Sequence, residues 1–382
     1  MKITRSSQTH FRKFITNKKK QELEKVMKEY SRIVNLFIGK YQWQIPQKTE
    51  FDLLKKEHIH SFDTWLSARL IKNAFSEGYG MVKSAKSNAK ERQTHYIRPT
   101  HTGKKMILSE TISTIKLNPK TKEFDMLVVL GCIGNKMKVT IPLKKNQHLN
   151  EFLNDITWKL SKSITLSKDY VQFSFEKEII KKDNGKVVGI DLGINKLIAT
   201  SDNQTFGDGY KELLIKLSNK KRGSIAYKKC KEEIREHIDY SIKQFPYKDY
   251  GLVIMEKLHN VHRNMKTQRR LSKNIRRVVS NWAYRYAYNR LMSACDLNCV
   301  RYRTVSNYKN SITCPNCNYA DKRNRKSQEE FLCQKCNYSD NADYTASKIA
   351  VIRAITEPYG VCFKAIKSEN NEVIPMYNFV RV

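Results

Sequence analysis

Three acidic residues stand where an apolar strand ends or a helix begins. Asp191 follows the apolar run Val187–Ile190, Glu256 follows Val253–Met255, and Asp343 opens a helical stretch. A carboxylate beside apolar strands is costly to bury unless something positive meets it. If the two strands are neighbours, the three acids converge, and two hard divalent cations would relieve their repulsion. Such ions could activate water and stabilise the leaving oxygen of a phosphodiester.

Each acid taken singly has an ordinary structural explanation. An Asp after an apolar strand is usually a turn or capping residue, and Asp343 could be a first-turn helix acid. Asp340, three residues earlier, competes with Asp343 for the same role. Because the three acids together are more specific than any one, we predict that Asp191, Glu256 and Asp343 hold two Mg²⁺ or Mn²⁺ ions.

Four of the nine cysteines follow a metal-binding spacing. Cys314 and Cys317 form one C-x2-C pair, and Cys333 and Cys336 form another after fifteen residues, within the range of zinc ribbons. Both thiolates of such a pair can reach one tetrahedral ion, and four sulfurs leave no open position. We therefore predict one structural Zn²⁺, with a pair of disulfides or chance as the alternatives.

The charge of the chain favours a polyanionic partner. There are 72 Lys and Arg against 37 Asp and Glu, a net charge of +35. Such an excess repels itself, and nucleic acid would neutralise it and release counterions. Basic membrane anchors are usually local, whereas these residues are spread over the whole length. The longest apolar run, Met126–Ile133, is too short to span a bilayer. Because Met1–Phe14 lacks a secretory apolar region, we expect a cytoplasmic protein without membrane contact.

Basic side chains also cluster beside two of these motifs. Arg323 and Arg325 lie between the cysteine pairs and could touch phosphates, although a solvated loop tip explains each equally well. Seven more lie soon after Glu256, where they could guide a phosphate backbone toward the acids or belong to a solvated loop. They are Arg263, Lys266, Arg269, Arg270, Lys273, Arg276 and Arg277.

Apolar periodicity predicts the elements that position these residues. A period of 3.6 predicts helices over 18–41 and about 64–90, and alternation predicts a strand at 171–175 and a hairpin of 126–130 with 137–141. After a turn signal at 183–185, two strands form a hairpin, and further strands alternate with helices. That order favours an RNase H-like α/β domain. The strands are 187–190, 197–201, 252–255 and 300–305, and the helices are 211–241, 281–295 and 343–355.

The stretch 186–355 resembles the RuvC-like nuclease half of TnpB, the insertion-sequence-encoded relative of compact type V CRISPR effectors. GIDLG at 189–193, IMEKL at 254–258, the cysteine pairs between 314 and 336, and DYTAS at 343–347 match in type, order and spacing. The resemblance assigns the metal site to the same three acids. It departs at Asn310-Ser311, where Thr-Ser is usual, at Thr345-Ala346-Ser347, where Asn-Ala-Ala is usual, and at Asn318 and Asn337, where Gly commonly follows each knuckle.

The resemblance implies a multidomain α+β chain. A β-barrel wedge domain would comprise 1–16 and 105–180, a helical recognition insert 17–104, and the RuvC-like nuclease domain 186–310 and 338–382. The zinc ribbon, 311–337, would be an insert that binds target nucleic acid.

It also implies an activity: a monomeric protein with one guide RNA that cuts double-stranded DNA beside a short motif read by protein, while base pairing reads the sequence. A guide-dependent repressor that no longer cuts, and an unguided DNA-binding protein or conventional transposase, are the alternatives. A compact type V CRISPR effector would share the chemistry.

Overall fold

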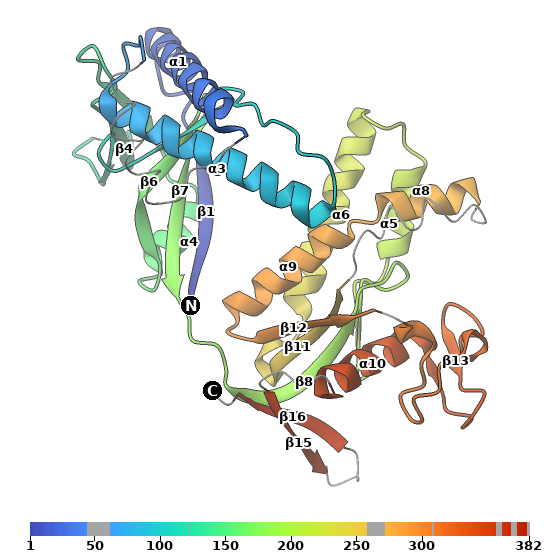
Figure 1. Ribbon diagram of the computed structural model, residues 1–382. Coiled ribbons are helices and arrows are strands. Elements are labelled where there is room, and N and C mark those ends of the chain that lie inside the picture. The colour runs from blue at the N-terminus through green and yellow to red at the C-terminus, as the bar shows by residue number, and fades with distance from the viewer. Residues whose placement is uncertain are drawn as a thin grey trace. The chain divides into compact units, whose positions relative to one another are not determined.

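The computed structural model describes residues 1–43, 62–121, 123–257, 272–307, 309–356, 361–367 and 373–379. The chain divides into two compact units (Figure 1). The first unit is Lys2–Glu178, and the second is Ile179–Val382 together with Met1. Within the described residues, no helix combines the length and the apolar character that crossing a bilayer requires.

The first unit joins two long helices to two antiparallel sheets (Figure 1). One sheet has the order β1-β7-β6-β2 and the other β3-β4-β5. The helices and the hairpin predicted from the sequence are all present. The bounds are β1 Lys2–His10, α1 Asn17–Tyr41, α3 Ala68–Arg92, β2 Lys105–Leu108, β3 Ser113–Leu117, β4 Met126–Leu130, β5 Val139–Leu143, α4 Gln147–Asn154, β6 Lys159–Ser167 and β7 Tyr170–Glu178.

The helices of the first unit begin at capping residues and pack on one apolar face. The side chain of Thr16 accepts a hydrogen bond from the Lys19 amide, and that of Ser67 accepts one from Leu70, so each satisfies an amide that the first turn leaves free. The face of α1 predicted from its periodicity is buried in a single core with α3 and the strands. Its members are Leu23, Val26, Met27, Tyr30, Ile33, Val34, Phe37 and Ile38.

The second unit is built on a mixed sheet of seven described strands, with the path β10-β9-β8-β11-β12. β8, β11 and β12 are parallel, whereas β9 and β16 pair antiparallel with β8. This hairpin followed by parallel strands is the arrangement predicted for an RNase H-like domain. The bounds are β8 Asn184–Asp191, β9 Ile198–Thr200, β10 Thr205–Phe206, β11 Tyr250–Lys257, β12 Arg301–Ser306, β15 Val361–Lys367 and β16 Val373–Phe379.

Helices cover both faces of this sheet (Figure 1). Val188, Val253 and Met255 pack in one core with α5 (Tyr210–Ser218), α6 (Ile225–Gln244) and α9 (Tyr284–Leu297). Their neighbours Val187, Leu252 and Ile254 face the opposite way and pack with α10 (Ala342–Thr356). Burial on both faces explains why these strands are continuous apolar runs rather than alternating ones.

The prediction of one helix over 211–241 is wrong, because two helices occupy this stretch. α5 ends at Ser218 and α6 begins at Ile225. Between them, Gly223 has a φ of 84°, which a side chain would strain, and the Ser224 side chain caps α6 by accepting from the Tyr227 amide. The strands β15 and β16 were not predicted.

Gly189 allows α10 to lie directly on β8. A Cβ atom on Gly189 would stand 2.0 Å from the backbone oxygen of Ser347. The absence of a side chain at this position therefore sets the depth of α10, which carries Asp343 at its start.

We expect Gly189→Ala to lower the free energy of unfolding by about 1–3 kcal/mol, because the added methyl forces α10 away from the sheet. Thermal or urea denaturation measures the change. Gly80→Ala in α3 is the control, since nothing lies within 4 Å of its added Cβ. Equal stability of the two variants would contradict this account of the packing.

Candidate active site

The sheet brings two of the predicted acids to the same edge. β8 ends at Asp191, and its parallel neighbour β11 pairs Met255 with Ile190, so Glu256 and Asp191 stand next in register. The third acid comes from α10, which packs against β8. Its first turn is fixed by Asn341, whose side chain accepts a hydrogen bond of 2.9 Å from the Asp343 amide.

These three acids line one cavity of about 350 Å³. Within the described residues, the one group of three or more metal-ligating side chains whose ligand atoms all lie within 4.8 Å of one another is the cysteine group. The acids therefore share a cavity without forming an equally tight cluster. Two-ion sites place their metals about 3.5–4 Å apart, which spreads the ligands over a wider space than one ion needs.

The cavity disfavours the charge of its own acids. Burial raises the pKa of Asp191 well above its usual value, and repulsion from Glu256 and Asp343 raises it further. Burial also raises the pKa of Glu256 to about 7, although a hydrogen bond from Asn310 opposes the rise. Asp343 has a pKa raised by burial and lowered in part by Arg325. The carboxylate oxygens of these three acids have few positive partners, and such oxygen ligands suit Mg²⁺ or Mn²⁺.

Arg325 lies in this cavity rather than at a solvated loop tip. Its Nη2 atom is 3.6 Å from Oδ1 of Asp343, and its charge also lowers the pKa values of Asp191 and Glu256. Arg323, two residues earlier, is exposed and paired with Asp321 at 2.8 Å. The sequence analysis gave Arg323 and Arg325 the same role, because the spacing of the cysteines does not predict which of the two lies in the cavity.

The alternative third acid, Asp340, lies in a different network. Its Oδ2 atom accepts hydrogen bonds of 2.7 Å from Lys348 and 2.6 Å from the Tyr338 hydroxyl. Asp340 does not line the cavity that holds Asp343.

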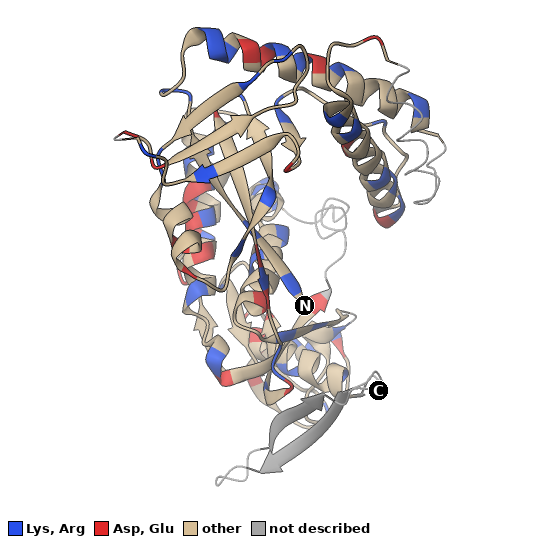
Figure 2. Ribbon diagram, turned by 90° about the vertical axis from the view of Figure 1, so that its left-hand side faces the viewer, with Lys and Arg blue, Asp and Glu red and all other residues tan. Residues whose placement is uncertain are grey.

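Part of the predicted basic stretch forms a helix. Lys273, Arg276 and Arg277 are exposed on α8 (Lys273–Asn281), whose start is capped by Ser272. Arg263, Lys266, Arg269 and Arg270 lie outside the described residues. Elsewhere Lys and Arg occur on helices and strands of both units, as Figure 2 shows in blue.

The four ribbon cysteines converge as their spacing predicts. Their sulfur atoms all lie within 4.8 Å of one another, and two of the separations, Cys314 to Cys336 and Cys317 to Cys333, are 3.6 Å. A disulfide would need about 2.05 Å, and the thiols are free. The sulfurs can therefore surround one tetrahedral ion, and four thiolates suit structural Zn²⁺.

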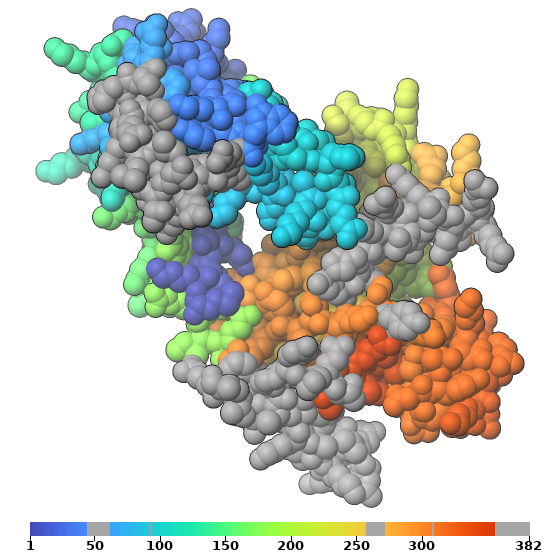
Figure 3. Space-filling model, viewed as in Figure 1, coloured from blue at the N-terminus to red at the C-terminus, as the bar shows by residue number. Residues whose placement is uncertain are grey.

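The two knuckles have the same backbone. Asn318 and Asn337 adopt left-handed φ values of 56° and 58°, and their amides donate to the carbonyls of Cys314 and Cys333. Asn tolerates this conformation better than most residues, which explains its presence at both positions where Gly is common. In Figure 3 the segment that holds the four cysteines, residues 314–336, forms part of an orange lobe at the edge of the second unit.

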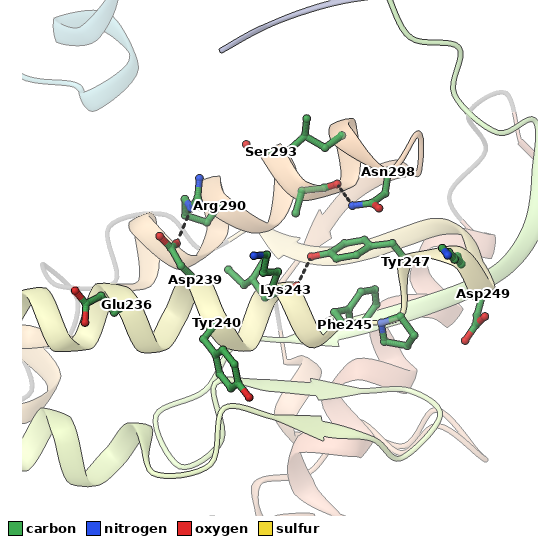
Figure 4. Close-up of a pocket in the computed structure, with 15 residues that line it drawn as sticks. Glu236, Asp239, Tyr240, Lys243, Phe245, Tyr247, Asp249, Arg290, Ser293 and Asn298 are labelled. Atoms are coloured by element: carbon green, nitrogen blue, oxygen red, sulfur yellow. Dashed lines mark hydrogen bonds and ion pairs between the residues drawn. The ribbon is translucent and has the colours of Figure 1, made fainter. Parts of the chain in front are cut away.

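A larger cavity, of about 900 Å³, lies between α6 and α9 (Figure 4). Some of its polar groups are paired within the chain. Arg290 donates to Asp239 at 2.6 Å, and the Tyr247 hydroxyl donates to the Ile242 carbonyl at 2.9 Å. The three predicted acids line the smaller cavity and not this one.

Comparison with known proteins identifies the fold. No family model matches the chain, and no curated protein matches it. Two solved structures align along nearly the whole chain. One, described as the cryo-EM structure of the Cas12f1-sgRNA-target DNA complex, has a TM-score of 0.56 with 12% identity over 91% of this chain and 99% of that chain. The other, described as the mini-RNA-guided endonuclease CRISPR-Cas_phi3, has a TM-score of 0.59 with 11% identity over 93% of both chains.

At this identity the likeness establishes the fold alone. The chain has the fold of compact type V CRISPR effectors, with a mixed sheet consistent with a RuvC-like domain and a four-cysteine cluster consistent with a zinc ribbon. TnpB itself is not among the proteins that these two comparisons name.

We expect the purified chain to contain one zinc ion, and Cys333→Ser to reduce the zinc content to about a tenth or less, because a buried ligand is lost from a closed site. Elemental analysis by mass spectrometry measures the ratio. Cys132→Ser, at an exposed cysteine of the first unit, should keep the full zinc content. Unchanged zinc in the Cys333 variant would exclude the ribbon site.

We also expect the stability of the chain, in buffer without Mg²⁺, to fall as pH rises from about 5 to 8. The folded state holds a proton on Glu256 up to a pKa of about 7, whereas the ordinary pKa of a glutamate is 4.5. Between these values the folded state binds more protons than the unfolded state, so rising pH costs up to about 3 kcal/mol.

Denaturation across this pH range, compared between variants, measures that contribution. Glu256→Gln should reduce the slope, with the contributions of Asp191 and Asp343 remaining, whereas Glu236→Gln, at an exposed glutamate of α6, should keep it. Mg²⁺ added at pH 8 should raise the stability of the unaltered chain. If Glu256→Gln and Glu236→Gln show the same slope, the buried carboxyl group is not the cause.

Proposed function

We propose that this chain is an RNA-guided DNA endonuclease of the TnpB type, with Asp191, Glu256 and Asp343 as ligands of two Mg²⁺ or Mn²⁺ ions. The observation that carries the proposal is the arrival of three acids, from β8, β11 and α10, in one cavity at the carboxyl edge of a RuvC-like sheet. The fold shared with RNA-guided endonucleases supports it.

The residues of the cavity take distinct parts in this reaction. The bound ions would supply an activated water and stabilise the leaving oxygen of the phosphodiester. Asp191 is repelled by both other acids, so it is the acid that the ions relieve most. Arg325 presents a guanidinium beside Asp343, and guanidinium groups bind phosphate oxygens well. We therefore assign Arg325 to the phosphate beside the scissile bond.

The proposed partners are one guide RNA and double-stranded target DNA. The net charge of +35 supports a polyanionic partner, and the Cas12f1 structure is described as a complex with RNA and target DNA. We assign target contact to the zinc ribbon and to the exposed basic side chains of α8. A compact type V CRISPR effector is the second candidate, because the two aligned structures are of that class. It would differ in the source of the guide rather than in the chemistry.

The test is cleavage of matched DNA by the complex of the chain with its RNA. We expect a discrete RNA to co-purify, and the complex to cut matched DNA in Mg²⁺. Asp191→Ala should lower the rate by more than about a hundredfold, since even residues that orient metal ligands contribute 10–100-fold. RNA binding and target binding should persist. Asp208→Ala, which removes an exposed partner of Lys196, is the control and should cut normally.

Three results would contradict parts of this proposal. Normal cutting by the Asp191 variant would remove the assigned metal site. A bound RNA with target binding but no cutting by the unaltered chain would indicate a guide-dependent repressor. DNA binding without any discrete RNA would indicate an unguided DNA-binding protein or a transposase.

A further inference from the structure

Asn310 holds one oxygen of Glu256 from inside the cavity wall. It begins the short 3-10 helix Asn310–Ile312, four residues after the end of β12 at Ser306, and its side chain is buried. Its Nδ2 atom donates to Oε1 of Glu256 at 2.6 Å and to the backbone carbonyl of Ser306 at 3.1 Å. The contact with Glu256 is short, as hydrogen bonds to carboxylates are.

The orientation of this amide is set by its two acceptors. Both partners of Nδ2 accept hydrogen bonds, so a rotated amide would set its oxygen against two other oxygens. The Oδ1 atom is left without a partner within the described part of the chain, although it is buried. An unpaired buried acceptor costs stability. In this arrangement Nδ2 of Asn310 donates to Glu256, while Oδ1 of Asn310 stays buried without a partner among the residues described.

The indole of Trp282, another residue of this cavity, also has a buried polar atom without a partner within the described ranges. The indole Nε1 of Trp282, which also lines the cavity, has no acceptor in the described residues. Unpaired polar atoms are uncommon in folded proteins and call for an explanation. Here two of them, one acceptor and one donor, belong to residues that line the cavity of the three acids.

Asn310 also stands where the parts of the site meet. The 3-10 helix packs against α10, which carries Asp343, and the Ser306 carbonyl belongs to the last residue of β12, the strand beside β11. A Glu side chain loses conformational entropy when it is fixed in one rotamer to bind an ion. A neutral donor that already fixes one carboxylate oxygen lowers that loss and leaves the other oxygen for a cation.

We propose that Asn310 is a positioning residue that orients the Glu256 carboxylate for metal binding. The proposal rests on the proposed function, because it assumes that Glu256 is a metal ligand. It assigns a role to a residue at which the chain departs from the pattern that it resembles.

The test is direct binding of Mn²⁺ to the full-length, zinc-loaded chain, followed by electron paramagnetic resonance, with sites that remain in Asp191→Ala subtracted. We expect Asn310→Ala to weaken this binding by about 10–100-fold, with zinc content and folding unchanged. Asn219→Ala, at an exposed asparagine after α5, is the matched control and should bind as the unaltered chain does. If Asn310→Ala does not fold, Asn310→Leu fills the same volume without a donor.

A double-mutant cycle separates positioning from general damage. In the Glu256→Ala background, Asn310→Ala should have an effect several times smaller than in the unaltered chain, because its partner is already gone. Equal effects in both backgrounds, or normal Mn²⁺ binding by Asn310→Ala, would overturn the inference. Absence of any Mn²⁺ binding that depends on Asp191 in the unaltered chain would instead overturn the proposed function.

Discussion

The second unit brings three carboxyl groups together in one partly buried cavity, where they raise one another's cost of carrying charge. In bulk solvent, neighbouring unit charges interact weakly, but burial removes the screening that makes their proximity tolerable. The positive charges of Arg325 and Arg353 and the amide of Asn310 offset only part of this cost. A site that its own residues leave under-neutralised has a built-in affinity for small cations of high charge.

The backbone makes this arrangement possible before any side chain contributes. Parallel pairing of β8 with β11 brings two strand ends to one edge, and the missing side chain at Gly189 lets α10 approach closely enough to add the third acid. The hydroxyl of Tyr284 also donates to the Glu256 carbonyl at 3.1 Å, which fixes the end of β11 from α9. The acids themselves destabilise the metal-free fold, so these contacts must hold them against their repulsion.

The features that could be predicted from the sequence are those whose interactions join residues close together in the chain. The buried strands, the amphipathic helix α1 and the cysteine knuckles have local signals, because periodicity and spacing express them within a few residues. The grouping of Asp191, Glu256 and Asp343 required in addition the order of strands and a resemblance to a known pattern. The sequence singled out Arg325 only as a possible phosphate contact and Asn310 only as a departure from the pattern, and it placed neither beside the acids. Their positions beside the acids depend on contacts with residues 18 and 54 positions away, which no local spacing predicts. Gly223, which divides the helical stretch after Tyr210, is a local signal that the prediction did not use.

The zinc ribbon and the cavity are also joined by covalent structure. Strand β14 (Ser339–Asn341) of the hairpin that continues from the ribbon runs without a loop into α10, and its partner β13 (Glu330–Leu332) leads into the second knuckle. The start of the helix that carries Asp343 therefore follows closely on a cluster of four thiols, which peroxide or other oxidants can convert to disulfides or sulfenic acids. Oxidation of these cysteines would therefore disturb the segment that carries Arg325 and the start of the helix that carries Asp343 together, so that the geometry of the cavity depends on reducing surroundings.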